Sequence, residues 1–245
     1  SGTTNYYAYN GAAPKLRNCS DLKVLQDIID LNIENGNFDQ YSAVMDDSGN
    51  NNGIIETFEL GLSGVDGFGQ VVASMEWNEE GSLIYLRFLM ILELPNSFGN
   101  LTALKELILQ DNQLTSLPQS MRDLKNLEKL DISSNLITTI PEIFGDMTSL
   151  SELYLNYNAI NEFPNGIGSL LNLKKMYIQN NQISSIPESI GNLNQLEELL
   201  LSNNNIESLP DNIVNLSNLI KLRLNENQLV DLPADIDVIG NLSAL

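Results

Sequence analysis

The sequence contains no histidine and a single cysteine, Cys19. Imidazole acid–base catalysis, Cys/His zinc sites and an internal disulfide are therefore excluded. No apolar run reaches the length of about 20 residues that a membrane-spanning helix needs. The first residues, Ser1, Gly2 and Thr3, do not have the pattern of a signal sequence, and we expect them to mark a mature or trimmed start.

Basic side chains are also scarce, with Lys+Arg 12 against Asp+Glu 32 and a formal net charge of -20 at pH 7. A chain with this charge repels nucleic acid and anionic lipid surfaces. We therefore predict no nucleic-acid partner and no membrane insertion. Because acidic residues occur along the whole sequence, we interpret the charge as a source of solubility rather than as a docking patch.

The dominant feature is a repeat of 23 residues. Asparagine recurs at this interval within the same apolar frame, and no insertion interrupts the copies. The repeated asparagines are Asn112, Asn135, Asn158, Asn181, Asn204 and Asn227. A fixed period of this length predicts a solenoid, because each unit buries its apolar face only by stacking on its neighbours.

The spacing within one unit predicts its shape. Leu107 and Leu109 alternate with Ile108, which indicates a short strand with the leucines inside and the isoleucine outside. The side chain of Asn112 carries donor and acceptor groups, so a column of asparagines is expected to satisfy the buried turns from coil to coil. Pro118 then begins a return segment that we predict to be helical or 3₁₀.

These units resemble the leucine-rich repeat family, in its 23-residue form with a Leu-Pro pair such as Leu117-Pro118 on the descending side. The resemblance implies an α/β fold: a right-handed leucine-rich repeat solenoid with a parallel concave sheet and short helical or 3₁₀ segments on the convex side. An N-terminal helical cap is expected before the first coil. The resemblance also implies a binding module, and an enzyme is not expected because no constellation of nucleophile, base and orienting residue is visible in the sequence.

We predict three regions. Residues 1–15 are expected to form a flexible tail, 16–80 an N-terminal cap, and 81–245 one degenerate and six regular repeats with an incomplete C-terminal end. Within the cap, apolar residues at helical spacing from the N-cap candidate Ser20 to Glu34 predict an amphipathic helix. A strand is predicted over residues 54–60 and a loop over 61–69.

The degenerate repeat is placed by its proline. Pro95 lies 23 residues before Pro118, so Ile84 and Leu86 are predicted to be its strand residues and Leu89 to replace the asparagine. The order of helix, loop, tryptophan and first Leu-Pro resembles the cap of secreted and cell-surface leucine-rich repeat proteins, as in plant receptor ectodomains and Bacteroidetes repeat proteins. The plant type closes its cap with paired cysteines, so the lone Cys19 favours the bacterial type.

We expect a ligand to bind on the concave face. The candidate contact residues are one outward column of the sheet together with the neighbouring Tyr157: Tyr85, Ile108, Asp131, Tyr154, Tyr157, Tyr177, Leu200 and Arg223. Tyrosine and arginine are favoured interface residues, although these tyrosines are also explained as a simple cover of the sheet. A second outward column alternates in charge, Glu106, Lys129, Glu152, Lys175, Glu198 and Lys221, with a Glu on both sides of each internal Lys. We interpret it as a solubility ladder rather than a charged ligand site.

Two other patterns are interpreted as framework. Residues 48–59 approach the spacing of a calcium-binding loop, but Ser48 stands where a carboxylate is needed, so we expect a solvated turn and no metal site or cofactor. Acceptor patterns for glycosylation begin at Asn18, Asn100, Asn215 and Asn241. Asn100 and Asn215 occupy one repeat position, which explains them without glycosylation.

The sequence thus predicts a non-enzymatic module that binds a protein or glycan at a cell surface or outside the cell. A structural or adhesive assembly protein and an intracellular scaffold remain as alternatives. No polar capping helix is predicted to cover Leu222, Leu224 and Leu229 of the final coil, so self-association through this end is a further possibility.

Overall fold

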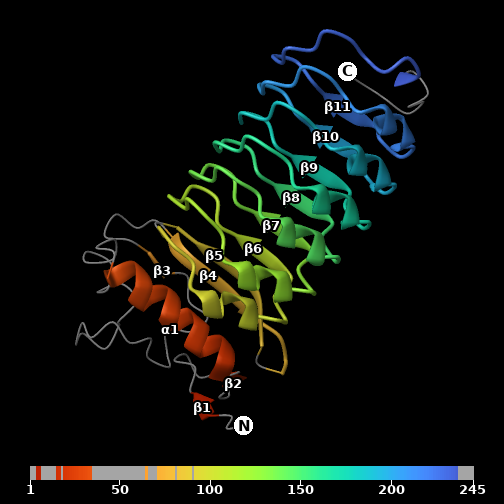
Figure 1. Cartoon of the computed structure of the whole chain (residues 1–245). Helices are drawn as coiled ribbons and strands as arrows, with labels where there is room; N and C mark the ends of the chain where they lie inside the picture. The colour runs from red at the N-terminus through yellow and green to blue at the C-terminus, as the bar shows by residue number, and fades with distance from the viewer. Residues whose placement is uncertain are drawn as a thin grey trace.

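The chain folds into an elongated stack of coils (Figure 1). The computed structural model describes residues 4–6, 15–17, 19–34, 64–65, 71–80, 82–89 and 91–236. Helix α1 (Cys19–Glu34) lies at one end of the stack and strand β11 (Lys221–Arg223) at the other. Each coil supplies one short strand to a common sheet, and each coil before the one that contains β11 also supplies one 3₁₀ turn to the opposite side. This arrangement confirms the predicted solenoid.

Within the part of the chain that the structure describes, the sheet has nine strands in the order β11-β10-β9-β8-β7-β6-β5-β4-β3. Strands β5 to β11 are parallel, and from β6 onward each step pairs residues that are 23 positions apart, such as Leu107 with Leu130. Strands β3 and β4 are antiparallel and lie at the cap end. The strands are β3 (Gly64–Val65), β4 (Val71–Trp77), β5 (Leu83–Phe88), β6 (Glu106–Ile108), β7 (Lys129–Asp131), β8 (Glu152–Tyr154), β9 (Lys175–Tyr177), β10 (Glu198–Leu200) and β11 (Lys221–Arg223).

The repeated asparagines satisfy the turns as predicted. The side-chain oxygen of Asn135 accepts the backbone N–H of Leu114 at 2.9 Å, and its amide donates to the carbonyls of Leu109 and Ile132 at 2.9 and 3.0 Å. Each repeated asparagine therefore joins its own turn to the turn of the preceding coil. The residue before each of them has a left-handed backbone with φ between 54° and 59°: Asp111, Ser134, Tyr157, Asn180, Asn203 and Glu226.

Among the described residues, six return segments are 3₁₀ turns of five residues, and each begins after a proline. These prolines have φ between -72° and -66°, the value that their ring imposes. The turns are η1 (Asn96–Asn100), η2 (Gln119–Asp123), η3 (Glu142–Asp146), η4 (Asn165–Ser169), η5 (Glu188–Asn192) and η6 (Asp211–Asn215). The 3₁₀ form of the predicted return segment is thus confirmed.

Helix α1 closes the first coil with apolar and polar contacts. Val24, Leu25 and Ile28 are fully buried and belong to the same core as the leucines of the coils. The buried carboxylate of Asp21 accepts the backbone N–H of Leu83 at 2.8 Å. The side-chain oxygen of Asn32 accepts the backbone N–H of Leu92 at 2.7 Å. The helix therefore satisfies backbone groups that a preceding coil would otherwise satisfy.

The register predicted for the degenerate coil is wrong. Strand β5 pairs Leu86 with Leu107 and Arg87 with Ile108, so the strand lies two residues later than the proline spacing indicated. Leu86 and Phe88 face the core, and Ile84 does not. Ile91 donates its N–H to the side chain of Asn112, just as Leu114 donates to Asn135, so Ile91 is the equivalent of Leu114. The turn between β5 and Ile91 is therefore two residues shorter than the corresponding turn of a regular coil, and it has no position for an asparagine.

The predictions for the cap, the N-terminal tail and the C-terminal end are only partly covered by the described residues. The predicted cap helix is present but begins at Cys19, so Ser20 lies inside its first turn. Within the stretch expected to be a tail, β1 (Thr4–Tyr6) pairs antiparallel with β2 (Lys15–Arg17). The strand predicted over 54–60, the calcium-loop pattern over 48–59 and the final residues from 237 onward lie outside the described residues.

Candidate functional site

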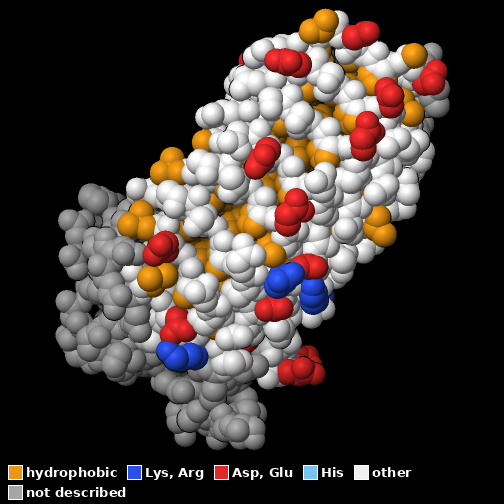
Figure 2. All heavy atoms as spheres, viewed as in Figure 1, with side chains coloured by type: hydrophobic (Ala, Val, Ile, Leu, Met, Phe, Trp, Pro, Cys, Tyr) orange, Lys and Arg blue, Asp and Glu red, His pale blue; other side chains and the backbone are white. Residues whose placement is uncertain are grey.

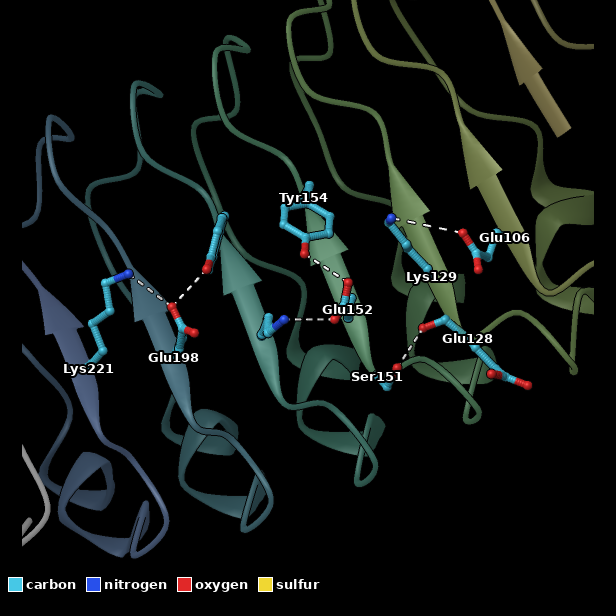
Figure 3. Close-up of polar contacts among 10 residues, drawn as sticks. Glu106, Glu128, Lys129, Ser151, Glu152, Tyr154, Glu198 and Lys221 are labelled. Atoms are coloured by element: carbon cyan, nitrogen blue, oxygen red, sulfur yellow. Dashed lines mark hydrogen bonds and ion pairs between the residues drawn. The ribbon is translucent and has the colours of Figure 1, made fainter. Parts of the chain in front are cut away.

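In strands β6 to β11 the middle residue is buried, and the first and third residues form two columns across the coils. Figure 3 shows polar contacts made by residues of these columns. In the first column, Lys129 approaches Glu106 at 3.9 Å, Lys175 approaches Glu152 at 2.9 Å, and Lys221 approaches Glu198 at 3.0 Å. Each lysine thus forms an ion pair with the glutamate of the preceding strand. The alternating column is a set of three separate pairs rather than the continuous ladder that the alternation suggested.

The two central tyrosines of the second column are fixed by the first column. The hydroxyl of Tyr154 donates to Glu152 at 2.8 Å, and the hydroxyl of Tyr177 donates to Glu198 at 2.7 Å. The rings meet edge to face, with centroids 5.0 Å apart and an interplanar angle of 88°. The ammonium of Lys221 lies 5.8 Å from the centre of the Tyr177 ring. Each tyrosine therefore belongs to a Tyr–Glu–Lys group that spans neighbouring strands.

These contacts shift the pKa of the groups involved. Burial, together with the hydrogen bond to Glu198, raises the pKa of Tyr177 to about 12. Burial and the hydrogen bond to Glu152 also raise the pKa of Tyr154. The hydrogen bond from Tyr177, followed by that from Lys221, lowers the pKa of Glu198. At neutral pH both phenols are therefore neutral donors, and the carboxylates that accept from them are ionised.

Tyr157 differs from the other two tyrosines. It lies in the turn after β8, its side chain is 58% exposed, and its backbone has φ 58°. The equivalent residues of the next two coils are Asn180 and Asn203, a residue type that tolerates this conformation well. A bulky aromatic residue is unfavourable there. The chain therefore exposes an aromatic ring at a position where its backbone is strained.

Two other predicted contact residues, Tyr85 and Asp131, lie in different surroundings from those of the central tyrosines. Tyr85 pairs with Glu106 and so belongs to the charged column, whereas Arg87 occupies the position beside Ile108. Asp131 is half-buried, and its carboxylate accepts the N–H and hydroxyl of its neighbour Ser133 at 3.0 and 2.6 Å. The prediction of Tyr85 in the tyrosine column is wrong because the register of β5 differs.

Leu200 was expected to be exposed, and this is also wrong. Its side chain is only 8% exposed, because it lies between the longer side chains of Tyr177 and Arg223 on the two adjacent strands. Tyr154 and Tyr177 are half-buried rather than freely exposed. The structure therefore brings the rings of Tyr154 and Tyr177 into contact, whereas Tyr157 lies in the turn after β8, where its backbone N–H donates to the carbonyl of Gln179 at 3.0 Å.

One polar group near the tyrosines was not found by sequence reasoning. The side-chain oxygen of Gln179, two residues after Tyr177, is buried and accepts no hydrogen bond from the described residues. A buried acceptor without a donor is unfavourable by about 1–3 kcal/mol. The alternation of inward and outward residues places Gln179 on the sheet face, but it gives no sign that its oxygen lacks a partner.

The described residues include no group of three or more His, Cys, Asp or Glu side chains arranged to hold a metal ion. Among the same residues, no helix has the length and hydropathy required to span a bilayer. The chemistry that the described face offers is aromatic contact, hydrogen bonding and ion pairing.

Family comparisons agree with this architecture. A leucine-rich repeat model matches residues 102–160, and a leucine-rich repeat region model matches residues 156–245. The two matches overlap and extend over all six regular coils. The chain belongs to the leucine-rich repeat family. A comparison with curated proteins found no match.

Solved structures show the same fold. The ectodomain of the Arabidopsis thaliana receptor kinase GASSHO1/SCHENGEN3, in complex with CASPARIAN STRIP INTEGRITY FACTOR 2, is 29% identical with a TM-score of 0.60, over 65% of this chain and 20% of that one. A TDR receptor is 30% identical with a TM-score of 0.58, over 65% and 28%. The Leptospira interrogans protein LIC12759 is 34% identical with a TM-score of 0.50, over 63% and 45%. The matched region spans less than half the length of each of these proteins.

Proposed function

We propose that this chain is a non-enzymatic protein-binding module whose sheet face contacts an extended segment of its partner around Tyr154, Tyr157 and Tyr177. The observation that carries the proposal is Tyr157, an aromatic ring that is 58% exposed on a left-handed backbone. Such a conformation costs of order 1–3 kcal/mol and is concentrated at functional sites. Asparagine at this position would remove most of that cost, so the presence of an exposed tyrosine here supports a use for its ring.

The neighbouring tyrosines supply a rigid surface for this contact. Hydrogen bonds to Glu152 and Glu198 fix the Tyr154 and Tyr177 rings, so binding them costs little side-chain entropy. Tyrosine is also enriched among the residues that dominate binding energy in protein interfaces.

Two of the similar structures support a protein ligand. The plant peptide hormone receptor RGFR1 in complex with RGF2 is 28% identical with a TM-score of 0.56, over 66% of this chain and 32% of that one. The GASSHO1/SCHENGEN3 structure is likewise a complex, and it is the ectodomain of a membrane receptor kinase. We extend from these relatives the proposal that this chain acts at a cell surface or outside the cell. Protease treatment of intact source cells tests the location, because only an external protein would be degraded.

Selection from a library of displayed random peptides, run beside a glycan array, tests the proposed function. We expect the wild-type protein to enrich peptides and to leave the glycans unbound. Hydrogen exchange with a selected peptide should then show protection of β8, β9 and the turn that contains Tyr157. Recovery of glycans alone, or protection confined to the 3₁₀ side of the coils, would show that the sheet face is not the protein-binding surface.

A further inference from the structure

Acidic and basic side chains are distributed unevenly around the coils, although acidic residues occur along the whole sequence. We define the turn edge as the segments that join each strand to its proline: 110–117, 133–140, 156–163, 179–186, 202–209 and 225–232. These segments contain no lysine or arginine. They carry five carboxylates, all exposed and none in an ion pair with another described residue: Asp111, Glu162, Glu207, Glu226 and Asp231.

The cations of the coils lie elsewhere. Lysines stand at or just before the strands, and Arg122 and Lys125 lie at the end of η2. Most of these cations already have a carboxylate partner, as Lys105 has Glu128 at 3.2 Å and Arg122 has Asp146 at 2.8 Å. On the face shown in Figure 2, basic side chains lie only in the half nearer the cap, whereas acidic side chains continue along its whole length. The turn edge therefore keeps an uncompensated negative charge.

Four large apolar side chains are exposed within this acidic edge. Val230 and Leu232, 89% and 41% exposed, lie in the last coil, and the other two lie nearer the middle of the edge. Leu136 in the second regular coil is 54% exposed, and Tyr157 in the third is 58% exposed. Backbone hydrogen bonds join their turns, since the N–H of Asn135 donates to the carbonyl of Tyr157 at 3.2 Å. The positions equivalent to Leu136 in the other regular coils are Gln113, Ala159, Gln182, Asn205 and Gln228. Leucine at this position is thus a departure from the repeat that adds apolar area beside Tyr157.

We infer that the partner is a positively charged protein segment, rich in Lys and Arg, which crosses from the tyrosines of the sheet face over Leu136 and Tyr157 onto the turn edge. This inference rests on the proposed function and names the chemistry of its ligand. Apolar contact at the centre and opposite charge around it are the usual arrangement of a protein interface. A formal net charge of -20 also steers a basic ligand toward the chain and repels an acidic one.

The size of the edge sets the length of this segment. Asp111 lies in the first regular coil and Glu226 in the sixth, five strand spacings apart. At about 4.8 Å per spacing the edge is about 24 Å long. An extended chain rises about 3.3 Å per residue, so about seven residues cover the edge. Random peptides of 12 residues are therefore long enough to serve as probes.

The test compares two variants that each remove two exposed carboxylates. Asp111→Asn with Glu162→Gln neutralises part of the turn edge, and Asp123→Asn with Asp211→Asn removes the same charge from the 3₁₀ side. Library selection on the wild-type protein should recover peptides that combine Lys or Arg with an apolar residue. For a recovered peptide we expect the turn-edge variant to raise Kd roughly 3- to 30-fold at low salt and the matched variant less than about 2-fold. The difference should disappear near 1 M salt, where charges are screened within about 3 Å.

Recovery of neutral or acidic peptides, or equal effects of the two variants, would overturn the inference. The proposed function is judged by a separate readout, the hydrogen-exchange footprint on β8 and β9. Peptides that protect these strands but are insensitive to the charges of Asp111 and Glu162 would leave the sheet-face function standing and remove the basic partner. Absence of any selected peptide, or glycan binding alone, would contradict both.

Discussion

The side-chain oxygen of Asn158 accepts a hydrogen bond from the backbone N–H of Ile137, one coil earlier, at 2.9 Å. Its amide group donates to the carbonyls of Ile132 and Leu155, both at 3.0 Å. One half-buried side chain thus satisfies backbone groups of two coils. The same arrangement at every repeated asparagine explains why the period tolerates no insertion.

Replacement of Asn158 by alanine should lower the free energy of unfolding by about 1–3 kcal/mol, because the N–H of Ile137 loses its partner. Urea unfolding measures the change. Asn172→Ala is the matched control, since this exposed amide makes one hydrogen bond, to the carbonyl of Thr148 at 2.9 Å. We expect it to cost less than about 0.5 kcal/mol. Equal unfolding midpoints for the two variants would show that the asparagine column does not stabilise the turns.

Much of the fold follows from the sequence because its signals are local and repeated. The alternation of Leu107, Ile108 and Leu109 predicts the strand, and the repeated asparagine and proline predict the turns and the 3₁₀ segments. The strand register of the degenerate coil, in contrast, cannot be predicted from the repeat. Its proline keeps the period but its turn is two residues shorter, and only pairing with β6 reveals the register.

Asn32 illustrates a contact that the sequence does not predict. The helical spacing of its apolar neighbours predicts α1, but it does not show that this asparagine binds the backbone of Leu92 and Glu93, about 60 residues away. Asn32→Ala should destabilise the cap by about 1–3 kcal/mol. Hydrogen exchange should show faster exchange at Leu92, whereas Asn172→Ala should leave this amide unchanged. Unchanged protection of Leu92 in Asn32→Ala would mean that Asn32 does not hold the helix on the coil.

The raised pKa of Tyr177 predicts that the folded protein loses stability at alkaline pH. Its pKa is about 12 in the folded protein and about 10 in an unfolded chain, so the unfolded state loses this proton first as the pH rises. The contribution is fully present below pH 10 and is lost between pH 10 and about 12. Urea midpoints measured from pH 8 to pH 11.5 should fall more steeply in the wild-type protein than in Tyr177→Phe. Identical slopes would contradict the half-buried, hydrogen-bonded state of this phenol.

The candidate site is less predictable than the fold because exposure depends on neighbouring coils. Leu200 is outward by alternation yet covered by Tyr177 and Arg223. Tyr157, in contrast, leaves a signal in the sequence. It is the one large aromatic residue in a column otherwise made of Asp, Ser, Asn and Glu, the residues that precede each repeated asparagine. Comparison of that column identifies the position, but only the structure shows its left-handed backbone.

The substitution Tyr157→Asn, examined for stability and for binding of a selected peptide, tests the account most directly. Because asparagine fits the left-handed backbone, the unfolding midpoint should stay the same or rise. The Kd of the peptide should increase by at least about tenfold, since the exposed ring is lost. Leu171→Asn is the matched control: it removes an apolar side chain that is 57% exposed in the same coil, and Asn194 already occupies the equivalent position. Weaker binding in Tyr157→Asn alone, at unchanged stability, is the predicted result; an unchanged Kd, or an equal loss in Leu171→Asn, would contradict it.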